Sequence, residues 1–349
     1  MEQPIGDPVG SAAGRPPFEF SIWTDMRSGP GGPDPARRFA ELRAEVQLAD
    51  RLGYGAFWSS EQHAVDDGYL GAQLTLLAGV ASLTSRLRLM PSAIVLPFHP
   101  LRHLVEQALV VDLLSGGRLA LCVAGGGYER EFRLFDVDMR RRAEIMERAL
   151  PMLRQGLSEL RMPDGPDGGL LPVTPAPVQA RIPILLGGLA GPVADRAARL
   201  ADGLVIFAHA DAEERVPALW HERIEPALRR HGRSVDGFHL SVGLVVWTTD
   251  DPERDWATML GPAFEYQQRR YDEWKGAPDP AGVRPAVDRM LVDTPDELAR
   301  RLMALRAAVP FAEIGLWYRL PGVPHADAMA HLERLSTVVS KLWGHRGPG

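Results

Sequence analysis

The chain has 349 residues, of which 45% are hydrophobic and 24% charged, and its formal net charge is −6 at pH 7. This acidic balance argues against a nucleic-acid partner, because phosphate binding needs a concentrated basic face. No run approaches the ~20 apolar residues of a membrane span. The single cysteine, Cys122, cannot form an internal disulfide, which fits a reducing compartment. We therefore expect a cytoplasmic protein with neither a nucleic-acid nor a membrane partner.

The two ends of the chain are predicted to lie outside the folded domain. Residues 1–17 are rich in Gly, Pro and small side chains and lack the apolar centre of a signal peptide, which predicts a disordered tail. We expect one domain over residues 18–342 and a short C-terminal tail over residues 343–349. One domain is reasonable at this length, because α/β barrels of roughly 250 residues or more commonly form a single unit.

Short apolar runs alternate with amphipathic ones along this domain. Each run is rich in β-branched or aromatic residues, as expected for strands that are buried on both faces. The predicted strands are Phe18–Trp23, Gly55–Ser59, Leu87–Leu96, Leu119–Ala124, Ile182–Leu186, Leu204–Ala208, Leu240–Thr248 and Glu313–Tyr318. Most are followed by a helical pattern, which leaves a closed barrel or an open doubly wound sheet.

The count of eight favours the closed architecture, an α/β fold of the (β/α)₈ TIM-barrel type. An open sheet would carry a glycine-rich phosphate turn after its first strand, and the prolines of Gly29–Pro33 suit an irregular loop better. Two insertions, residues 158–180 and 250–293, exceed simple strand–helix units. We expect them at the C-terminal face of the barrel, where long loops shape a pocket or a lid.

Polar residues at strand ends are the functional candidates in such a barrel, because its interior is packed. Glu61 and His63 follow the second strand and suit acid–base work or the orientation of a polar ring; the alternative is that they only bond to neighbouring loops. Ser92 and Ala93 interrupt the apolar third strand, which indicates a bulge, a close approach by a flat ligand or a tight core position.

Histidines four residues apart near the third strand raise the question of a metal site. Pro100 places His99 before the following helix and so separates it from the helical face of His103. No carboxylate stands beside them in the sequence. We therefore predict no metal site.

Two glycine-rich turns follow the fourth and fifth strands. Gly126 and Gly127 let backbone amides approach a ligand, and Tyr128 adds a ring for stacking. Gly187, Gly188 and Leu189 precede a helix that begins near Pro192, and the amides and dipole of a helix N-terminus favour a phosphate. With no nucleophile motif and no metal set, a bound organic cofactor is the economical source of reactivity.

The order of these motifs resembles that of the bacterial luciferase-like monooxygenases. The similar stretches are Ser60–His63, Pro91–Pro97 with His99 and Pro100, Leu113–Arg118, Gly126–Phe132, Phe135–Asp138 and Pro183–Gly188. The similarity extends over nearly the whole predicted domain. Each motif alone is weak, but their order and spacing together are fairly specific.

The resemblance implies a barrel, frequently dimeric, that binds reduced FMN or a deazaflavin coenzyme. FMN members typically receive reduced flavin from a separate reductase and use O₂ to attack a small organic substrate, whereas deazaflavin members exchange a hydride with theirs. The resemblance also implies a non-proline cis peptide beneath the flavin ring, which corresponds to Ser92–Ala93 here.

The sequence departs from luciferase at three places. Gln62 occupies the position of the catalytic histidine and cannot act as a general base, and the adjacent His63 would face the other side of a strand. The phosphate-binding arginine has no counterpart around Val123–Gly125. The hydroxyl-bearing turn after the fifth strand appears here as Leu189–Gly191, which leaves backbone amides to hold a phosphate.

Our leading hypothesis is a flavin-dependent monooxygenase that uses reduced FMN and O₂ on a small organic substrate, as a homodimer supplied by a separate flavin reductase. The expected flavin contacts are Glu61, Gln62, Ser92, Ala93, Gly126, Gly127 and Tyr128, with Gly187, Gly188 and Leu189 at the phosphate. The catalytic candidates are His63, His99 and His209, together with Gln62 at the luciferase histidine position. The alternatives are a deazaflavin-dependent hydride-transfer enzyme, a non-catalytic luciferase-like subunit and, last, a metal-dependent hydrolase.

Overall fold

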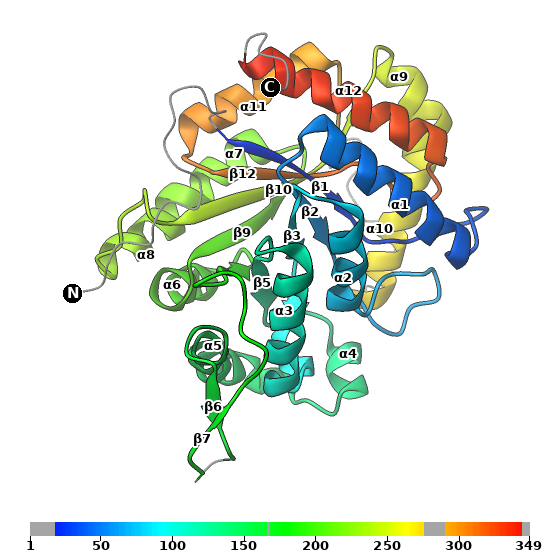
Figure 1. Cartoon of the computed structure of the whole chain (residues 1–349). Helices are drawn as coiled ribbons and strands as arrows, with labels where there is room; N and C mark the ends of the chain where they lie inside the picture. Colours follow the sequence, from blue (N-terminus) through cyan, green and yellow to red (C-terminus); the bar gives the residue numbers. More distant parts are fainter. Residues whose placement is uncertain (1–17, 166–167, 276–289, 344–349) are drawn as a thin grey trace.

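Parallel strands follow one another around a barrel in chain order, and helices cover their outer side (Figure 1). The computed structural model describes residues 18–165, 168–275 and 290–343. The barrel strands are β1 (Glu19–Thr24), β2 (Ala56–Ser59), β3 (Arg88–Pro91), β4 (Ile94–Val95), β5 (Leu121–Ala124), β8 (Ile184–Gly187), β9 (Gly203–Ala208), β10 (His239–Thr248) and β12 (Glu313–Trp317). Their order in the sheet is β3-β2-β1-β12-β10-β9-β8-β5-β4. Only Ser92 and Ala93 separate β3 from β4, so these two segments are one barrel strand, and the predicted (β/α)₈ barrel is confirmed.

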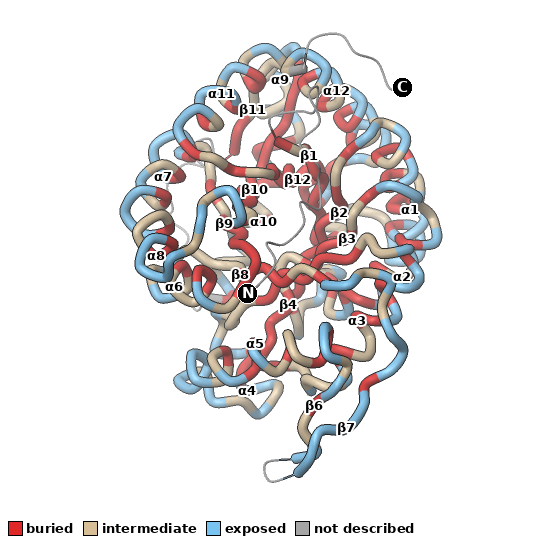
Figure 2. The backbone as a smooth tube through the Cα atoms, turned by 60° about the vertical axis from the view of Figure 1, so that its left-hand side comes forward, coloured by how far each residue is buried: buried red, intermediate tan, exposed pale blue. Residues whose placement is uncertain are grey.

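The outer helices cover the strands. They are α1 (Pro35–Leu52), α2 (Gln73–Leu83), α3 (Leu101–Ser115), α4 (Glu129–Leu134), α5 (Arg142–Ser158), α6 (Gly191–Leu200), α7 (Ala212–Leu219), α8 (Glu225–Arg230), α11 (Pro295–Ala308) and α12 (His325–Trp343). Side-chain caps mark the starts of two of them, α1 and α11. In α1, the Asp34 side chain accepts a hydrogen bond from the Arg37 amide, and Gly53 ends the helix at φ 83°. The main core lies between these helices and the strands, which are buried along most of their length (Figure 2).

Tryptophans and glycines fill the barrel interior together. The register pairs Trp23 of β1 with Trp58 of β2 and with Trp317 of β12, so the Cα atoms of the three tryptophans lie at one level of the barrel. The ring centroid of Trp23 lies 6.0 Å from that of Trp58 and 4.7 Å from that of Trp317. Gly315 makes room for this layer, because a Cβ atom there would lie 2.2 Å from Trp58 Cζ3. The interior is therefore a packed core and not a channel.

A buried carboxylate closes the amino-terminal end of the barrel. Glu313 accepts hydrogen bonds from Trp58 Nε1 at 3.1 Å and from Ser241 Oγ at 3.2 Å, and it pairs with Arg88 at 3.1 Å. Burial alone would raise the pKa of Glu313, but the Arg88 charge and a hydrogen bond from His239 hold it well below its usual range. This network lies at the opposite end of the strands from the predicted site, so we assign it to stability.

The two predicted insertions both contain regular secondary structure, and one of them needs a correction of its place. Residues 158–180 were expected at the C-terminal face of the barrel, but they connect the end of α5 to the start of β8 and so belong to its amino-terminal side; they contain the antiparallel hairpin β6 (Arg161–Pro163) and β7 (Leu170–Pro172). Residues 250–293 contain α9 (Pro252–Asp255), the π-helical turn η4 (Trp256–Leu260), α10 (Gly261–Lys275) and the short strand β11 (Leu291–Asp293), which pairs with β10. Helix α12 ends at Trp343, one residue beyond the predicted domain boundary. The predicted tail over residues 1–17 lies outside the described residues.

Candidate functional site

A carboxylate between two histidines lies at the carboxyl end of β2. Glu61 is buried, and its Oε1 atom lies 3.0 Å from His63 Nε2 and 3.1 Å from His99 Nε2. Burial alone would raise the pKa of Glu61, but hydrogen bonds from His63 and His99 lower it below the usual value. An ionised Glu61 therefore orients both rings and favours a proton on each facing nitrogen. The three predicted residues come together, as a hydrogen-bonded group suited to proton transfer.

The expectation that strand alternation turns His63 to the side opposite Gln62 does not apply in the structure. Strand β2 ends at Ser59, so residues 60–63 belong to a loop and are not bound by strand alternation. The His63 amide donates to Glu131 Oε1 at 2.7 Å, and Gln62, which is buried, donates its amide to the Leu70 carbonyl at 3.0 Å. These hydrogen bonds connect the loop after β2 to α4 and connect the start of that loop to Leu70 near its end.

The Ser92–Ala93 peptide is cis, as the family resemblance implied. The Gln73 side chain of α2 donates to the Ala93 carbonyl at 3.1 Å, and the Ser92 amide donates to the Ser59 carbonyl at 2.6 Å. On the other side lies Gly187 at the end of β8, where an added Cβ would come within 3.2 Å of Ala93 Cβ. The missing side chain at Gly187 thus leaves this segment flat and lined by small groups.

The turn after β5 carries the next predicted residues. Gly126 has a φ of 74°, and a Cβ there would lie 2.7 Å from Val95 Cγ1, so only glycine fits. Gly127 is exposed, with nothing within 4 Å of an added Cβ. Burial raises the pKa of Tyr128, so its hydroxyl stays protonated and acts as a hydrogen-bond donor. The Tyr128 ring packs edge-on against Trp274, with centroids 6.2 Å apart.

The turn between β8 and α6 has the geometry of an anion site. Gly188 takes a φ of 147°, which is rare for residues with a side chain, and α6 begins at Gly191 with Pro192 in its first turn. Among the described residues, no side chain caps this helix start. Arg223 from the π-helical turn η3 (Trp220–Ile224) donates to the Leu189 carbonyl at 3.0 Å, which adds a cation beside the turn. Free amides, a helix dipole and an arginine together suit a phosphate.

His209 lies apart from the other predicted catalytic residues. It follows β9, which is four strands from β2 in the sheet order and therefore across the barrel. Its ring packs edge-on against Phe207, with centroids 5.0 Å apart. The structure thus groups His63 and His99 around Glu61 and places His209 on the far side of the mouth.

One cluster at the mouth was missed by the sequence analysis. Arg27, three residues beyond β1, is buried among the rings of Tyr69, Tyr271 and Trp274. Its position directly after a barrel strand was a usable signal. Because Tyr271 and Trp274 come from α10, more than 240 residues along the chain, the aromatic surroundings could not be read from local sequence.

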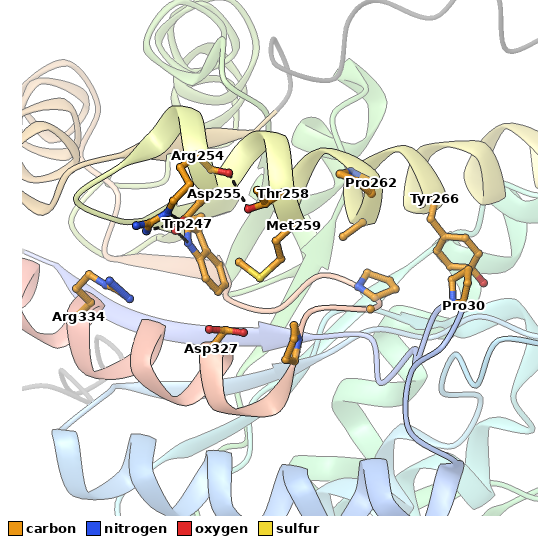
Figure 3. Close-up of a pocket in the computed structure, with 14 residues that line it drawn as sticks. Pro30, Trp247, Arg254, Asp255, Thr258, Met259, Pro262, Tyr266, Asp327 and Arg334 are labelled. Carbon is orange, nitrogen blue, oxygen red and sulfur yellow. Dashed lines mark hydrogen bonds and ion pairs between the residues drawn. The ribbon is translucent and has the colours of Figure 1, made fainter.

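A cavity of about 700 Å³ lies to one side of the strand ends, between α12 and the α9–α10 insertion (Figure 3). Its charged end carries Arg254, Asp255, Asp327 and Arg334, and its other end carries Pro30 and Tyr266. None of the predicted site residues lines it. We therefore place the candidate site at the strand ends and regard this cavity as a separate feature of the rim.

Glu41, Glu45 and His325 lie close enough together to hold a metal ion. Arg38 already pairs with Glu45 at 3.0 Å, and Arg319 pairs with Glu41 at 2.8 Å. Two arginines compensate the two carboxylates, so the cluster is a buried ion-pair network joining α1 to the segment after β12.

The comparisons with known proteins identify the family of the chain. The family model for luciferase-like monooxygenases matches residues 18–310. The chain belongs to the luciferase-like monooxygenase family. It is 32% identical over 114 residues to the alkanal monooxygenase alpha chain of Photorhabdus luminescens, and the match covers 32% of this chain and 31% of that one. Against the oxygenase component of the flavin-dependent trigonelline monooxygenase of Acinetobacter baylyi, the identity is 31% over 116 residues, or 33% and 32% of the two chains. The matched segment thus spans about a third of the length of these relatives.

Solved structures share the fold of this family member. The monooxygenase RslO1 from Streptomyces bottropensis aligns with a TM-score of 0.82 at 20% identity, over 94% of this chain and all of that one. A type II Baeyer–Villiger monooxygenase component from Pseudomonas putida, solved in complex with FMN, aligns with a TM-score of 0.71 at 16% identity, over 93% and 98% of the two chains. Among residues 18–165, 168–275 and 290–343, no helix has the length and apolar character needed to cross a bilayer.

Proposed function

We propose that this protein is a flavin-dependent monooxygenase that uses reduced FMN and O₂ to oxidise a small organic substrate. The observation that carries the proposal is the small-residue surface formed by Ala93 and Gly187, beside a start of α6 that no described side chain caps. A planar ring needs a bed without projecting side chains, and a phosphate needs free amides. These two features adjoin at β8, which suits a phosphorylated flavin.

Each part of the site has a role in this proposal. Ala93 and Gly187 support the flavin ring, while Gly126, Gly127 and Tyr128 border it. Gly188 and Leu189 hold the phosphate, with Arg223 adding positive charge. Reduced flavin, when bound, would be the group that reacts with O₂. The ionised Glu61 would hold His63 and His99 in position to move a proton at their Nε2 atoms.

The proposal extends to partners and location. We infer that a separate reductase supplies the reduced flavin, as the family resemblance implies, and that the chain works as a homodimer in the cytoplasm. Cytoplasmic location is supported by the single cysteine, Cys122, which is buried and unpaired.

A test of the phosphate assignment uses Gly188→Val with Gly79→Ala as its control. A side chain at Gly188 would enter a backbone conformation that favours glycine and would press on Val193, whose Cγ1 lies 3.3 Å from the added Cβ. We expect anaerobic titration to show at least tenfold weaker binding of reduced FMN. Gly79 is an exposed residue of α2, and a Cβ added there would have no atom within 4 Å, so Gly79→Ala should bind reduced FMN as tightly as the wild type. Unchanged FMN binding by folded Gly188→Val would refute the phosphate assignment.

A deazaflavin-dependent hydride transfer is the second candidate, and Arg223 is the observation that favours it, because that coenzyme carries a longer anionic tail. An F420-dependent secondary alcohol dehydrogenase aligns with a TM-score of 0.71 at 12% identity. Titrating the wild-type protein with reduced FMN and with the reduced deazaflavin coenzyme distinguishes the monooxygenase from the hydride-transfer enzyme. Preference for the deazaflavin would move the function to hydride transfer, and binding of neither would favour a non-catalytic subunit.

A further inference from the structure

The guanidinium of Arg27 lies buried at the barrel mouth with its outer edge unused. Its Nε donates to Asp25 Oδ2 at 2.6 Å. Among the described residues, neither Nη1 nor Nη2 has a hydrogen-bond partner, although both atoms are buried. Nη1 comes within 3.8 Å of Asp67 Oδ2, which is beyond hydrogen-bond distance. Arg27 is 3% exposed as a whole.

Three aromatic rings enclose this edge, and we call Arg27, Tyr69, Tyr271 and Trp274 the Arg27 box. The guanidinium carbon lies 4.9 Å from the ring centroid of Tyr69, 5.0 Å from that of Tyr271 and 5.5 Å from that of Trp274. The Tyr69 and Tyr271 hydroxyls are bonded to each other at 3.2 Å, and the Trp274 ring reaches Tyr128.

The Arg27 box stands over the strand ends, beside the proposed flavin bed. Arg27 follows β1, Tyr69 follows β2, Tyr128 follows β5, and Tyr271 and Trp274 lie on α10 in the insertion after β10. The segments that follow β1, β2, β5 and β10 start from different sides of the barrel, so they come together over its mouth. The Arg27 box therefore borders the space where a substrate of the flavin would bind.

Leaving these donors unpaired is costly. A buried donor without an acceptor has given up its hydrogen bonds to water, and cation–π contacts with the three rings offset part of that cost. An oxygen atom that accepted from Nη1 and Nη2 would remove this cost. Since the rings of α10 now cover both nitrogens, such a ligand enters by displacing Tyr271 or Trp274.

The charges nearby favour a neutral acceptor. Asp25 already pairs with Arg27, and Asp67 lies near both Arg27 and Arg270, whose Nε is 3.6 Å from Asp67 Oδ2. A third carboxylate at this place would be repelled by Asp25 and Asp67. A carbonyl oxygen avoids the repulsion, and the enclosing rings suit a planar molecule.

We propose that the substrate is a neutral, planar molecule whose carbonyl oxygen accepts hydrogen bonds from Arg27. This inference rests on the proposed function, because it places the substrate above the flavin bed. It assigns Arg27 to substrate anchoring, and it assigns Tyr69 and the α10 ring that is not displaced to the walls that hold the planar part.

Three matched probes test the chemistry of the acceptor. 2-Acetylnaphthalene has a carbonyl, 2-naphthoate has a carboxylate, and 2-ethylnaphthalene has no acceptor, while the ring system stays the same. With full-length protein and isothermal titration calorimetry, we expect the acetyl compound to bind at least tenfold more tightly than the other two. Equal binding of the three, or no binding of any, would overturn the proposal, and a preference for 2-naphthoate would overturn the neutral class.

Two variants test whether Arg27 itself is the donor. Arg27→Met should abolish the preference for the acetyl compound, whereas Arg270→Met, which removes the other arginine near Asp67, should keep it. Loss in both variants would make Arg27 a structural residue. If Arg27→Met does not fold, Arg27→Lys should lower the preference at an unchanged melting temperature. Reduced FMN titrated in parallel separates the two claims: normal FMN binding without probe preference refutes only the substrate, and probe preference without FMN binding refutes only the flavin proposal.

Discussion

Individual glycines decide which side chains the barrel interior can hold. At Gly315 the Trp58 ring occupies the place of a side chain, and at Gly243 the Trp23 ring does so, with Cζ3 2.8 Å from an added Cβ. Neither backbone position needs positive φ, so the requirement is one of space alone. Replacing glycine by alanine should therefore lower the free energy of unfolding inside the barrel and raise it on the surface.

Gly315→Ala and Gly79→Ala form a matched pair that tests this at the residue scale. In the first, the added methyl overlaps the Trp58 ring, and overpacking of this kind costs about 1–3 kcal/mol or more. In the second, the methyl meets open space on α2, and replacing a helical glycine gains about 0.5–1 kcal/mol. Urea unfolding should show a lower free energy of unfolding for Gly315→Ala and a higher one for Gly79→Ala. A stable Gly315→Ala protein would mean that the indole layer can shift.

At the scale of elements, a buried ion-pair network joins the first helix to the end of the chain. Glu45 of α1 accepts from Arg38, Tyr318 and Arg319 and pairs with His325 at the start of α12. Burial alone would raise the pKa of Glu45, but the Arg38 charge and the His325 hydrogen bond lower it to about 2. The network thus fastens α1 to α12 across the seam where the barrel closes.

We expect Glu45→Gln to lower the free energy of unfolding at pH 7 by about 3–5 kcal/mol, the range for breaking a buried pair. The folded pKa lies below the ordinary value of 4.5. The carboxylate therefore stabilises the fold above that value, and its contribution is lost as the pH falls towards 2. The difference between wild type and Glu45→Gln should shrink between about pH 4.5 and pH 2. A constant difference over that range would contradict the assignment; exposed Glu129→Gln serves as the control.

The strands were predictable because each is short, apolar and followed by a helix. The hairpin β6–β7 was not, since Pro163 to Gly169 reads as a loop and the strands are three residues each. In the site, Glu61, His63 and His99 were found at strand ends, and they meet because β2 and the β3–β4 strand are parallel neighbours in the sheet. The environment of Arg27 was not predictable, because its rings come from α10 in an insertion whose packing has no periodic signal.

At the scale of the whole molecule, one outer face is more apolar than the rest. Val110, Leu113 and Leu114 share a face of α3 and are 42–52% exposed. Val178, which is 56% exposed, lies beside this face because its backbone amide donates a hydrogen bond to Asp112 Oδ2. Contiguous apolar patches of this kind mark interaction sites. This face is the natural place for the proposed homodimer contact.

Leu114→Lys should then shift the protein towards the monomer, because a lysine in the centre of an apolar contact must lose its hydration. The matched control is Met303→Lys on α11, where an exposed apolar residue stands on another helix. Sedimentation velocity over a range of concentrations should show a larger monomer fraction for Leu114→Lys than for Met303→Lys. A wild-type protein that stays monomeric at high concentration would refute the dimer proposal.

The layer of three indoles also gives the molecule an internal optical signal. Rings 4.7 Å and 6.0 Å apart couple their electronic transitions, and the coupling depends on their fixed mutual angles. Each indole N–H has a partner within the fold: Ser60 for Trp23, Glu313 for Trp58 and the Arg319 carbonyl for Trp317. The near-ultraviolet circular dichroism of the unlabelled protein should therefore report the closed barrel. Because Trp23 and Trp317 lie nearest the mouth, a ligand that settles there would change this spectrum before any chemistry occurs.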